Sequence, residues 1–433
     1  MKSKFTCMNQ LNKILVILGL ALSIIPSSCK KPDGGGHFDD ILSNKIVIEW
    51  SNIAFEAAGG GDEAHPILAS RINAMTHIAI HDALNAIVPV YEQYAYHQQS
   101  GLANPFAAVA SAAHTVLKAA WGDTTGFLDG KLAASLSTIP DGPAKTKGIA
   151  LGIASGNAIL ALRAGDGAYQ NPVVDLPPST VPGVYNIVPP YTFVFAPFWK
   201  TMQTFSLKNY DQFRSSPPPA LNSEIYTKAF NEVKEVGDVN STVRTPDQTA
   251  YAKWWYEPSD IGWPRIARTE AANFNPGLYK TARMFALLNM AIADAYIAGW
   301  DSKFYYNFWR PYTAIRGAAT DGNAETIADM NWESAEITPP IPDYPSTHSA
   351  LGNAAATVLT HFFGSHSSFS GTSTTAFPTG AIRSFSSFMQ AADENADSRV
   401  RAGIHFRFAC DAGQLLGNKV AKWTLENQLK RLH

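Results

Sequence analysis

The stretch SRINAMTHIAIHDALNAIV, residues 70–88, is apolar on nearly all sides. Apolar residues at this density and at helical spacing indicate a helix that is buried all round. Segments of the same character recur at 106–121, 146–164, 222–237 and 281–300, whereas the alternating pattern of strands is nearly absent. The sequence therefore predicts an all-α protein.

The composition is that of a folded chain with a large interior. The chain has 433 residues, of which 46% are hydrophobic and only 16% are charged, enough for one large core or two smaller ones. A net charge of -2 and a pI of about 6.6 give no electrostatic footprint for nucleic acid. Any anion site must therefore depend on a local group of cationic side chains and not on the net charge of the chain.

The N-terminus has the pattern of an export signal. Basic residues precede a short apolar run at 14–25, and small residues then lead to Cys29 in a "SSC" ending that resembles the lipobox of bacterial lipoproteins. We expect 1–28 to be a lipoprotein signal peptide, Cys29 to be lipidated and 29–45 to be a flexible tether, with an ordinary cleaved signal as the alternative. Cys410 is then left without an intramolecular partner. The expected location is the periplasmic face, outer membrane or cell surface of a bacterium, with membrane contact only through the lipid anchor.

The helical domain is expected to cover 46–433, with one long interruption. Residues 171–219 contain ten prolines and many aromatic residues. This composition excludes a helix and predicts a long ordered segment that wraps the surface or covers a cleft.

Three short segments in the C-terminal third carry cationic or histidine side chains. The first is KFYYNFWRP, in which Lys303 and Arg310 are seven residues apart, close to two helical turns. The spacing predicts that both leave one face of a helix that Pro311 ends or bends. Taken alone, the pair is equally compatible with two solvated surface cations.

The second segment is YPSTHSALG, residues 344–352. Ser346 is a good N-cap, and the helix is expected to begin at Thr347 or His348. The free N–H groups of a helix start favour anions, and an imidazole there can exchange protons near neutral pH. Alone, this is also compatible with a capped helix that carries an incidental histidine.

The third segment is SRVRAGIHFRF, in which Arg399 and His405 are six residues apart. On one continuous helix they would point to different sides. Gly403 can end one helix just past Arg401 and let His405 open the next, so that the two side chains converge on one ligand. A surface arginine and a core histidine remain the alternative for this segment alone.

The order of the three segments resembles the three-part signature of vanadium-dependent haloperoxidases and of the type 2 phosphatidic acid phosphatase superfamily. Further stretches, such as HIAIHDALNAI and ADAYIAGWDSKFYYNFWRPYTAI, look like bacterial haloperoxidase-like members over nearly all of 46–425. The resemblance implies an all-α fold of two packed helical bundles, with the anion site in the core of one.

The resemblance also implies roles for individual residues. His405 would bond the metal of a vanadate cofactor through a ring nitrogen, and His348 would be the acid/base. The vanadate oxygens would be held by cationic, hydroxyl and backbone groups from Lys303, Arg310, Ser346, Thr347 and Arg399. Phosphate, a near isostere of vanadate, can occupy the same site. A multiply charged oxyanion taken out of water does need several fixed cations.

Two positions depart from the family pattern. Thr347 replaces the usual glycine between serine and histidine, which adds bulk beside the anion. Ala409 stands where an acidic residue commonly follows the last histidine by four, with Asp411 two residues later, so the residue that orients His405 stays open.

The remaining candidates are histidines and aspartates in helical segments. His77 and His81 lie four residues apart and precede Asp82. We interpret them as buried, hydrogen-bonded histidines rather than a metal pair, given the apolar character of their helix. The candidate partners for the arginines are Asp82, Asp294, Asp301 and Asp411.

Three functions follow from this pattern. The first is a vanadium-dependent haloperoxidase that uses hydrogen peroxide to oxidise a halide, bromide or iodide rather than chloride, and so halogenates a small organic acceptor. The second is a phosphatase that cleaves phosphomonoesters through a phosphohistidine at His405. The third is a surface lipoprotein that only binds an oxyanion.

Overall fold

The computed structural model describes residues 42–62 and 65–432. The predicted all-α fold is confirmed: helices dominate the described part, and its strands form only two short antiparallel pairs. The predicted signal peptide, Cys29 and most of the tether lie outside the described residues and stay predictions.

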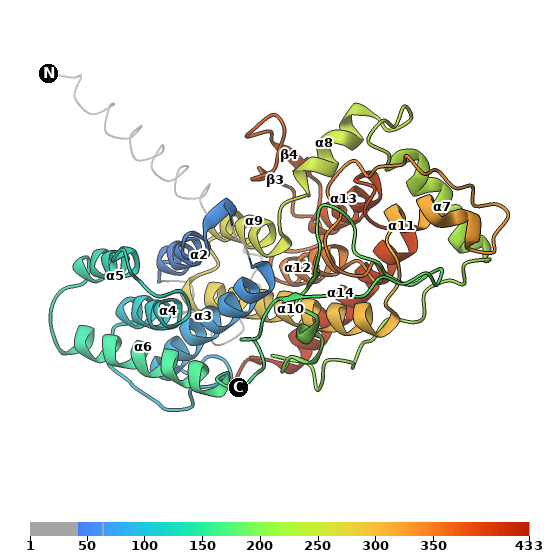
Figure 1. Ribbon diagram of the computed structural model, residues 1–433. Coiled ribbons are helices and arrows are strands. Elements are labelled where there is room, and N and C mark those ends of the chain that lie inside the picture. The colour runs from blue at the N-terminus through green and yellow to red at the C-terminus, as the bar shows by residue number, and fades with distance from the viewer. Residues whose placement is uncertain (1–41, 63–64, 433) are drawn as a thin grey trace, which may run out of the picture.

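Two groups of helices pack side by side (Figure 1). The first group comprises α2 (Lys45–Ala57), α3 (Pro66–Ile87), α4 (Pro105–Trp121), α5 (Phe127–Ser137) and α6 (Pro143–Leu162). The second comprises α7 (Glu224–Val236), α8 (Pro246–Trp254), α9 (Ser259–Phe274), α10 (Leu278–Tyr306), α11 (Pro311–Gly317), α12 (Thr347–Phe363), α13 (Phe388–Arg401) and α14 (Arg407–Asn427). The two-bundle expectation is thereby met.

Short elements complete the fold. They are the 3-10 turns η1 (Gly60–Asp62), η2 (Pro197–Thr201) and η3 (Ala318–Thr320), the pair β1 (Val173–Val174) with β2 (Val194–Phe195), and the pair β3 (Phe369–Gly371) with β4 (Arg383–Phe385). No helix within the described ranges combines the length and apolarity needed to cross a bilayer.

Helix α10 joins the two bundles. It has 29 residues, and every residue from Met284 to Lys303 is buried. It packs against α3 of the first bundle and against α12 and α14 of the second. The C-terminal end of α10 thereby reaches the centre of the second bundle.

Glycines allow the closest helix contacts in each bundle. A Cβ on Gly152 of α6 would lie 2.4 Å from the carbonyl oxygen of Ala108 in α4. In the second bundle, a Cβ on Gly413 of α14 would lie 2.2 Å from the oxygen of Ser346, and one on Gly417 would lie 2.0 Å from that of Ala350. These contacts fix α14 against the first turns of α12.

The proline-rich segment 171–219 contacts α10 and the loop that precedes α12, and its role as a cover stays a prediction. Asp294 of α10 accepts the backbone N–H groups of residues 205, 206 and 207. Arg214 makes a two-pronged ion pair with Asp301, with both N–O distances 2.7 Å. Tyr344 donates to the carbonyl of Ser216, so the segment also contacts the loop that precedes α12.

The glycine contacts between α12 and α14 give the first testable prediction. Gly417→Ala should destabilise the protein by about 1–3 kcal/mol, because the new methyl overlaps a fixed carbonyl of α12. Thermal unfolding followed by circular dichroism measures the change.

Gly130→Ala is the matched control. Gly130 is an exposed helical glycine whose added Cβ meets nothing within 4 Å. Alanine there should raise stability by about 1 kcal/mol through helix propensity. Equal changes in Tm for the two variants would contradict the close α12–α14 contact.

Candidate active site

The three predicted segments meet in the second bundle. They contribute the end of α10, the start of α12 and the turn between α13 and α14, which lie together in Figure 1. The side chains of Lys303, Arg310, Ser346 and Arg399 and the ring of His405 are all buried. Residues that are far apart in sequence thus form one interior cluster.

Two cations of the first segment bind the loop that leads into α12. The ammonium of Lys303 donates to the carbonyls of Pro342 at 2.6 Å and Asp343 at 2.8 Å. The Nε of Arg310 donates to the carbonyl of Ile341 at 2.8 Å. Both cations are therefore fixed by backbone oxygens, and neither is a solvated surface charge.

The prediction that Lys303 and Arg310 share one helix face is wrong. Helix α10 ends at Tyr306, because Asn307 adopts a left-handed conformation with φ 46°. Arg310 is extended and caps α11, with Pro311 at its first position. The two side chains still converge, since the chain reverses between them and both reach the same loop.

The start of α12 follows the prediction. The helix begins at Thr347, and the Ser346 side chain caps it by accepting the backbone N–H of Ser349 at 3.3 Å. The hydroxyl of Ser349 also donates to the Ser346 oxygen at 3.0 Å. The hydroxyl proton of Ser346 is left to donate to a ligand.

Thr347 turns its methyl toward α10. A Cβ on Gly299 would lie 2.2 Å from Cγ2 of Thr347, so the threonine fills a space that a larger residue in α10 would occupy. The side chain of Thr347, which was expected to add bulk beside the anion, therefore packs between α10 and α12. The position keeps its backbone N–H at the helix start.

The third segment also turns as predicted, with one difference. Helix α13 ends at Arg401, and Gly403 has φ 77° and touches Gly237, whose oxygen would lie 2.3 Å from an added Cβ. However, α14 begins at Arg407, so His405 lies in the turn and does not open the helix. The turn is closed by the Gly403 contact, and this leaves the imidazole free to face the other two segments.

Arg399 faces the cluster from the last turn of α13. Its Nη1 donates to the carbonyl of Trp255 at 2.7 Å, and its guanidinium carbon lies 5.5 Å from the ring centre of Tyr256. Burial, with Arg310 as a minor like-charged contributor, lowers the pKa of Arg399 to about 10.

Asp343 is the residue that the sequence did not reveal. Its Oδ1 lies 2.7 Å from Nδ1 of His405, within ion-pair range although the two groups are not aligned as a hydrogen bond. Nη1 of Arg310 lies 3.0 Å from Nε2 and 3.5 Å from Nδ1 of the same ring. A signal was available: Asp343 stands three residues before Ser346, in the same PDYPSTH stretch.

The charges of the cluster do not balance. Lys303, Arg310 and Arg399 stand against the one carboxylate in contact, Asp343, which lies 3.7 Å from Arg310. Burial is the largest cause that lowers the pKa of Lys303 well below its usual range, and the nearby Arg310 lowers it further. Burial likewise raises the pKa of Asp343 to about 7, against the opposing pull of Arg310 and Lys303.

Both histidines are held neutral by the same conditions. Burial and then the charge of Arg399 lower the pKa of His348 well below its usual range, which a hydrogen bond to the Trp255 backbone partly opposes. Burial and then Arg310, Lys303 and Arg399 lower the pKa of His405. A neutral imidazole offers a ring nitrogen lone pair to a metal or to a proton.

Several buried polar atoms of the cluster have no hydrogen-bond partner among the described residues. They include Nη2 of Arg310, Nε of Arg399 and Nε2 of His348. Unsatisfied buried donors are rare and costly in folded proteins. Excess positive charge and free donors together are what a buried oxyanion such as vanadate or phosphate requires.

Most of the other candidates serve the scaffold. Asp82 accepts the backbone N–H groups of residues 94, 95 and 96, and Asp294 accepts those of the proline-rich segment, so neither is an arginine partner. Asp301 does bind an arginine, but it is Arg214, outside the cluster. Asp411 lies near Arg407 and does not orient His405, a role that falls to Asp343.

His77 and His81 are buried in α3, in the first bundle. His77 stacks on Phe285 at 4.9 Å between ring centres, and burial lowers its pKa to about 3. Nδ1 of His81 lies 3.2 Å from Asp82. The interpretation as buried histidines holds, but hydrogen bonding is seen for His81 only, since Nδ1 of His77 has no partner in the described part.

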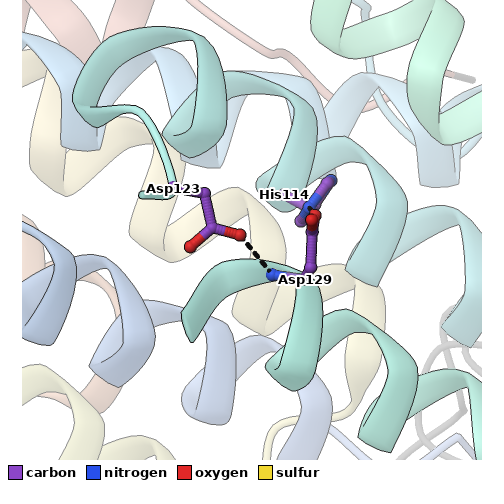
Figure 2. A group of neighbouring side chains, drawn as sticks. All are labelled: His114, Asp123 and Asp129. Atoms are coloured by element: carbon purple, nitrogen blue, oxygen red, sulfur yellow. Dashed lines mark hydrogen bonds and ion pairs between the residues drawn. The ribbon is translucent and has the colours of Figure 1, made fainter. Parts of the chain in front are cut away.

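A separate group of His114, Asp123 and Asp129 lies at the outer end of the first bundle (Figure 2). Asp123 accepts the backbone N–H groups at 128 and 129 and so caps α5. Asp129 is bound by the ammonium of Lys118 at 2.7 and 2.8 Å and by His114 at 2.8 Å. These partners account for both carboxylates without a metal.

Comparison with known proteins supports the oxyanion interpretation. A family model described as the VCPO second helical-bundle domain matches residues 283–432, which contain all three segments. The crystal structure of a bacterial vanadium-dependent iodoperoxidase superposes with a TM-score of 0.77 at 26% identity, covering 90% of this chain and 98% of that one. In sequence and in fold, the chain is therefore similar to vanadium haloperoxidases.

Two further proteins show a similarity of the same kind. Vanadium chloroperoxidase of Curvularia inaequalis is 28% identical over 204 residues, which are 40% of this chain and 33% of that protein, so the match spans about a third of the relative's length. A holo-type bacterial vanadium-dependent chloroperoxidase has a TM-score of 0.69 at 17% identity over 90% of this chain and 98% of its own, which shows the shared fold.

The contact between Asp343 and His405 gives a second prediction. Asp343→Asn should weaken orthovanadate binding about 10–100-fold, because the carboxylate orients the imidazole that would bond the metal. The same change makes the pocket more positive, so binding of phosphate, which forms no metal bond, should stay equal or strengthen. Isothermal titration calorimetry with both anions separates the two effects.

Asp411→Asn is the control for this experiment. Asp411 is the carboxylate favoured by position in the sequence, and it lies outside contact with His405, so its loss should leave both affinities unchanged. If orthovanadate binds Asp343→Asn as tightly as it binds the wild type, Asp343 does not orient His405.

Proposed function

We propose that the protein is a vanadate-dependent peroxidase that oxidises halide with hydrogen peroxide, bromide or iodide rather than chloride, and passes the oxidised halogen to a small organic acceptor. The observation that carries the proposal is the buried, charge-unbalanced cluster around His405, on a fold shared with a bacterial vanadium-dependent iodoperoxidase. When bound, vanadate supplies the oxidising chemistry by activating peroxide toward the halide.

The cationic side chains would hold the oxyanion. Lys303, Arg310 and Arg399 bring positive charge that the interior does not otherwise neutralise, and the free nitrogens of the two arginines can donate to oxygens. The hydroxyl of Ser346 and the backbone N–H of Thr347 would add donors at the start of α12. These groups stay fixed when the ligand enters, because backbone carbonyls and caps already position them.

His405 would bond the metal through Nε2. Asp343 lies beside Nδ1, which favours the tautomer with its proton on Nδ1 and puts the lone pair on Nε2. Nη1 of Arg310 lies 3.0 Å from Nε2, and a metal bonded to Nε2 would take the place of this contact. This assignment also explains why the imidazole must be neutral, and burial among three cations keeps it so.

His348 would move protons. Its ring is fixed by a contact with the backbone of Trp255 and carries a buried Nε2 with no partner in the described part of the chain. A neutral imidazole beside the oxyanion can accept a proton from peroxide and return it to the product oxygen.

A phosphatase is the second candidate, because the same cations would hold phosphate and a neutral His405 could act as nucleophile. The two functions differ in what vanadate does. In the haloperoxidase, vanadate switches on peroxide-dependent halide oxidation; in the phosphatase, it inhibits hydrolysis of phosphomonoesters. A protein that only binds an oxyanion would show neither activity.

Variants of the two histidines give the third prediction. His405→Ala should abolish tight vanadate binding and halide oxidation, since the other groups offer charge but no metal bond. His348→Ala should keep vanadate with modest weakening while turnover falls about a hundredfold or more, the usual scale for an acid/base group. Vanadate binding by calorimetry and iodide or bromide oxidation by absorbance measure the two effects.

His361→Ala is the matched control, since His361 lies in the last turn of the same helix, α12, away from the cluster. It should behave as the wild type. One result would favour the phosphatase over the haloperoxidase: vanadate inhibits phosphomonoester hydrolysis by the wild type, and the vanadate-loaded wild type oxidises no halide with peroxide.

A further inference from the structure

A surface hollow lies beside Arg399. Lys253, Tyr256, Glu336 and Phe377 line it together with residues 374–376, and it encloses about 360 Å³. A second hollow of about 260 Å³ adjoins it and shares Glu336. Glu336 therefore stands between two depressions that are open to solvent.

The ring of Tyr256 forms the boundary between the hollow and the buried cluster. One of its contacts is the guanidinium of Arg399, at 5.5 Å from the ring centre, and its hydroxyl donates to the carbonyl of Ile337 at 2.7 Å. Glu336 is fixed on the same side, because its backbone N–H donates to the carbonyl of Ala402 at 3.0 Å, just before the turn that carries His405. The ring of Tyr256 thus contacts the hollow on one side and Arg399 on the other.

The carboxyl of Glu336 is half-buried and has no hydrogen bond or ion pair within the described residues. The charged and titratable groups that face it are Lys253 at the end of α8, Arg399 of α13, Arg244 in the loop before α8, and the phenol of Tyr256. Burial raises the pKa of Glu336, and the three cations oppose the rise. Burial therefore favours the protonated carboxyl and the cations favour the carboxylate, which are the two forms between which a proton carrier alternates.

The proposed reaction consumes protons. Oxidation of a halide ion by hydrogen peroxide takes up one proton and yields hypohalous acid and water: the peroxide oxygen–oxygen bond breaks, one oxygen bonds the halide, and the other leaves as water. The halide loses two electrons and the peroxide gains them. Each turnover therefore needs one proton from solvent, while the cluster itself is buried.

We propose that this hollow is the vestibule of the active site and that Glu336 is a proton-relay residue, which takes protons from solvent and hands them inward past Arg399. Glu336 gives up its proton as a carboxylic acid to His348, the acid/base proposed above, becomes a carboxylate, and is protonated again from bulk water. The inference rests on the proposed function, because it supplies the proton that halide oxidation by peroxide consumes.

Proton uptake on anion binding tests the link without any turnover. A bound orthovanadate adds negative charge beyond Arg399, which favours the protonated form of Glu336 and so draws in part of a proton. Calorimetric titration of orthovanadate in buffers of different ionisation enthalpy measures this uptake. The ionisation of the ligand itself cancels when two variants are compared.

Glu336→Gln is the test variant and Glu333→Gln is its matched control. Glu333 lies three residues earlier and pairs with Arg316 at 2.8 Å, away from Arg399. Glu336→Gln should take up a smaller fraction of a proton on binding orthovanadate than the wild type, while Glu333→Gln should match the wild type.

Turnover gives the second readout for the same two variants. In the vanadate-loaded protein, Glu336→Gln should lower the iodide oxidation rate about tenfold or more toward alkaline pH, and small carboxylic acids such as acetic acid should restore part of the rate. A merely structural role for Glu336 would give no such rescue.

The outcomes separate the two claims. An active wild type with Glu336→Gln unchanged in both proton uptake and rate overturns the relay alone. A loaded wild type that oxidises no halide overturns the proposed function and the relay with it. Reduced proton uptake together with acid rescue of the rate supports the relay.

Discussion

Lys303, Arg310 and Arg399 bury their positive charges in one cluster, and the rest of the second bundle is arranged to make this possible. Among the described residues, the carboxylate that forms an ion-pair contact with them is that of Asp343, beside Arg310. Removing one such ion from water costs several kcal/mol even after relaxation. The cost is partly offset by carbonyls, because Lys303 and Arg310 donate to the backbone at residues 341–343. What is left over is positive charge, and only an anion can neutralise it.

The scaffold keeps these charges in place by close backbone contacts. Gly413 lets α14 approach the carbonyl of Ser346, and Gly299 receives the methyl of Thr347, so the start of α12 is fixed from two sides. Gly403 packs against Gly237 and so closes the turn that carries His405. The site is therefore formed before a ligand arrives, which is the condition for strong electrostatic stabilisation of bound charge.

Much of this could be predicted from the sequence, because local patterns determined it. Apolar density predicted the helices, and a serine followed by a helical run predicted the start of α12 to within one residue. The course of the backbone between Lys303 and Arg310 could not be predicted from the sequence. Asn307 adopts a left-handed conformation and ends α10 before Pro311 would have ended it. Asp343 was missed because its role depends on the loop folding back onto His405, a contact between residues 62 positions apart. The surroundings of Glu336 likewise arise only when α8, α13 and their connecting loops pack together.

The most direct test of the buried-charge account is a crystal structure of the protein grown with orthovanadate. The account predicts density for vanadium bonded to Nε2 of His405, with its oxygens contacting Lys303, Arg310, Arg399 and the Ser346 hydroxyl. Protein side chains around the site should barely move from the positions described above. A pocket filled only by water at saturating orthovanadate, or an anion held without contact to His405, would contradict the account.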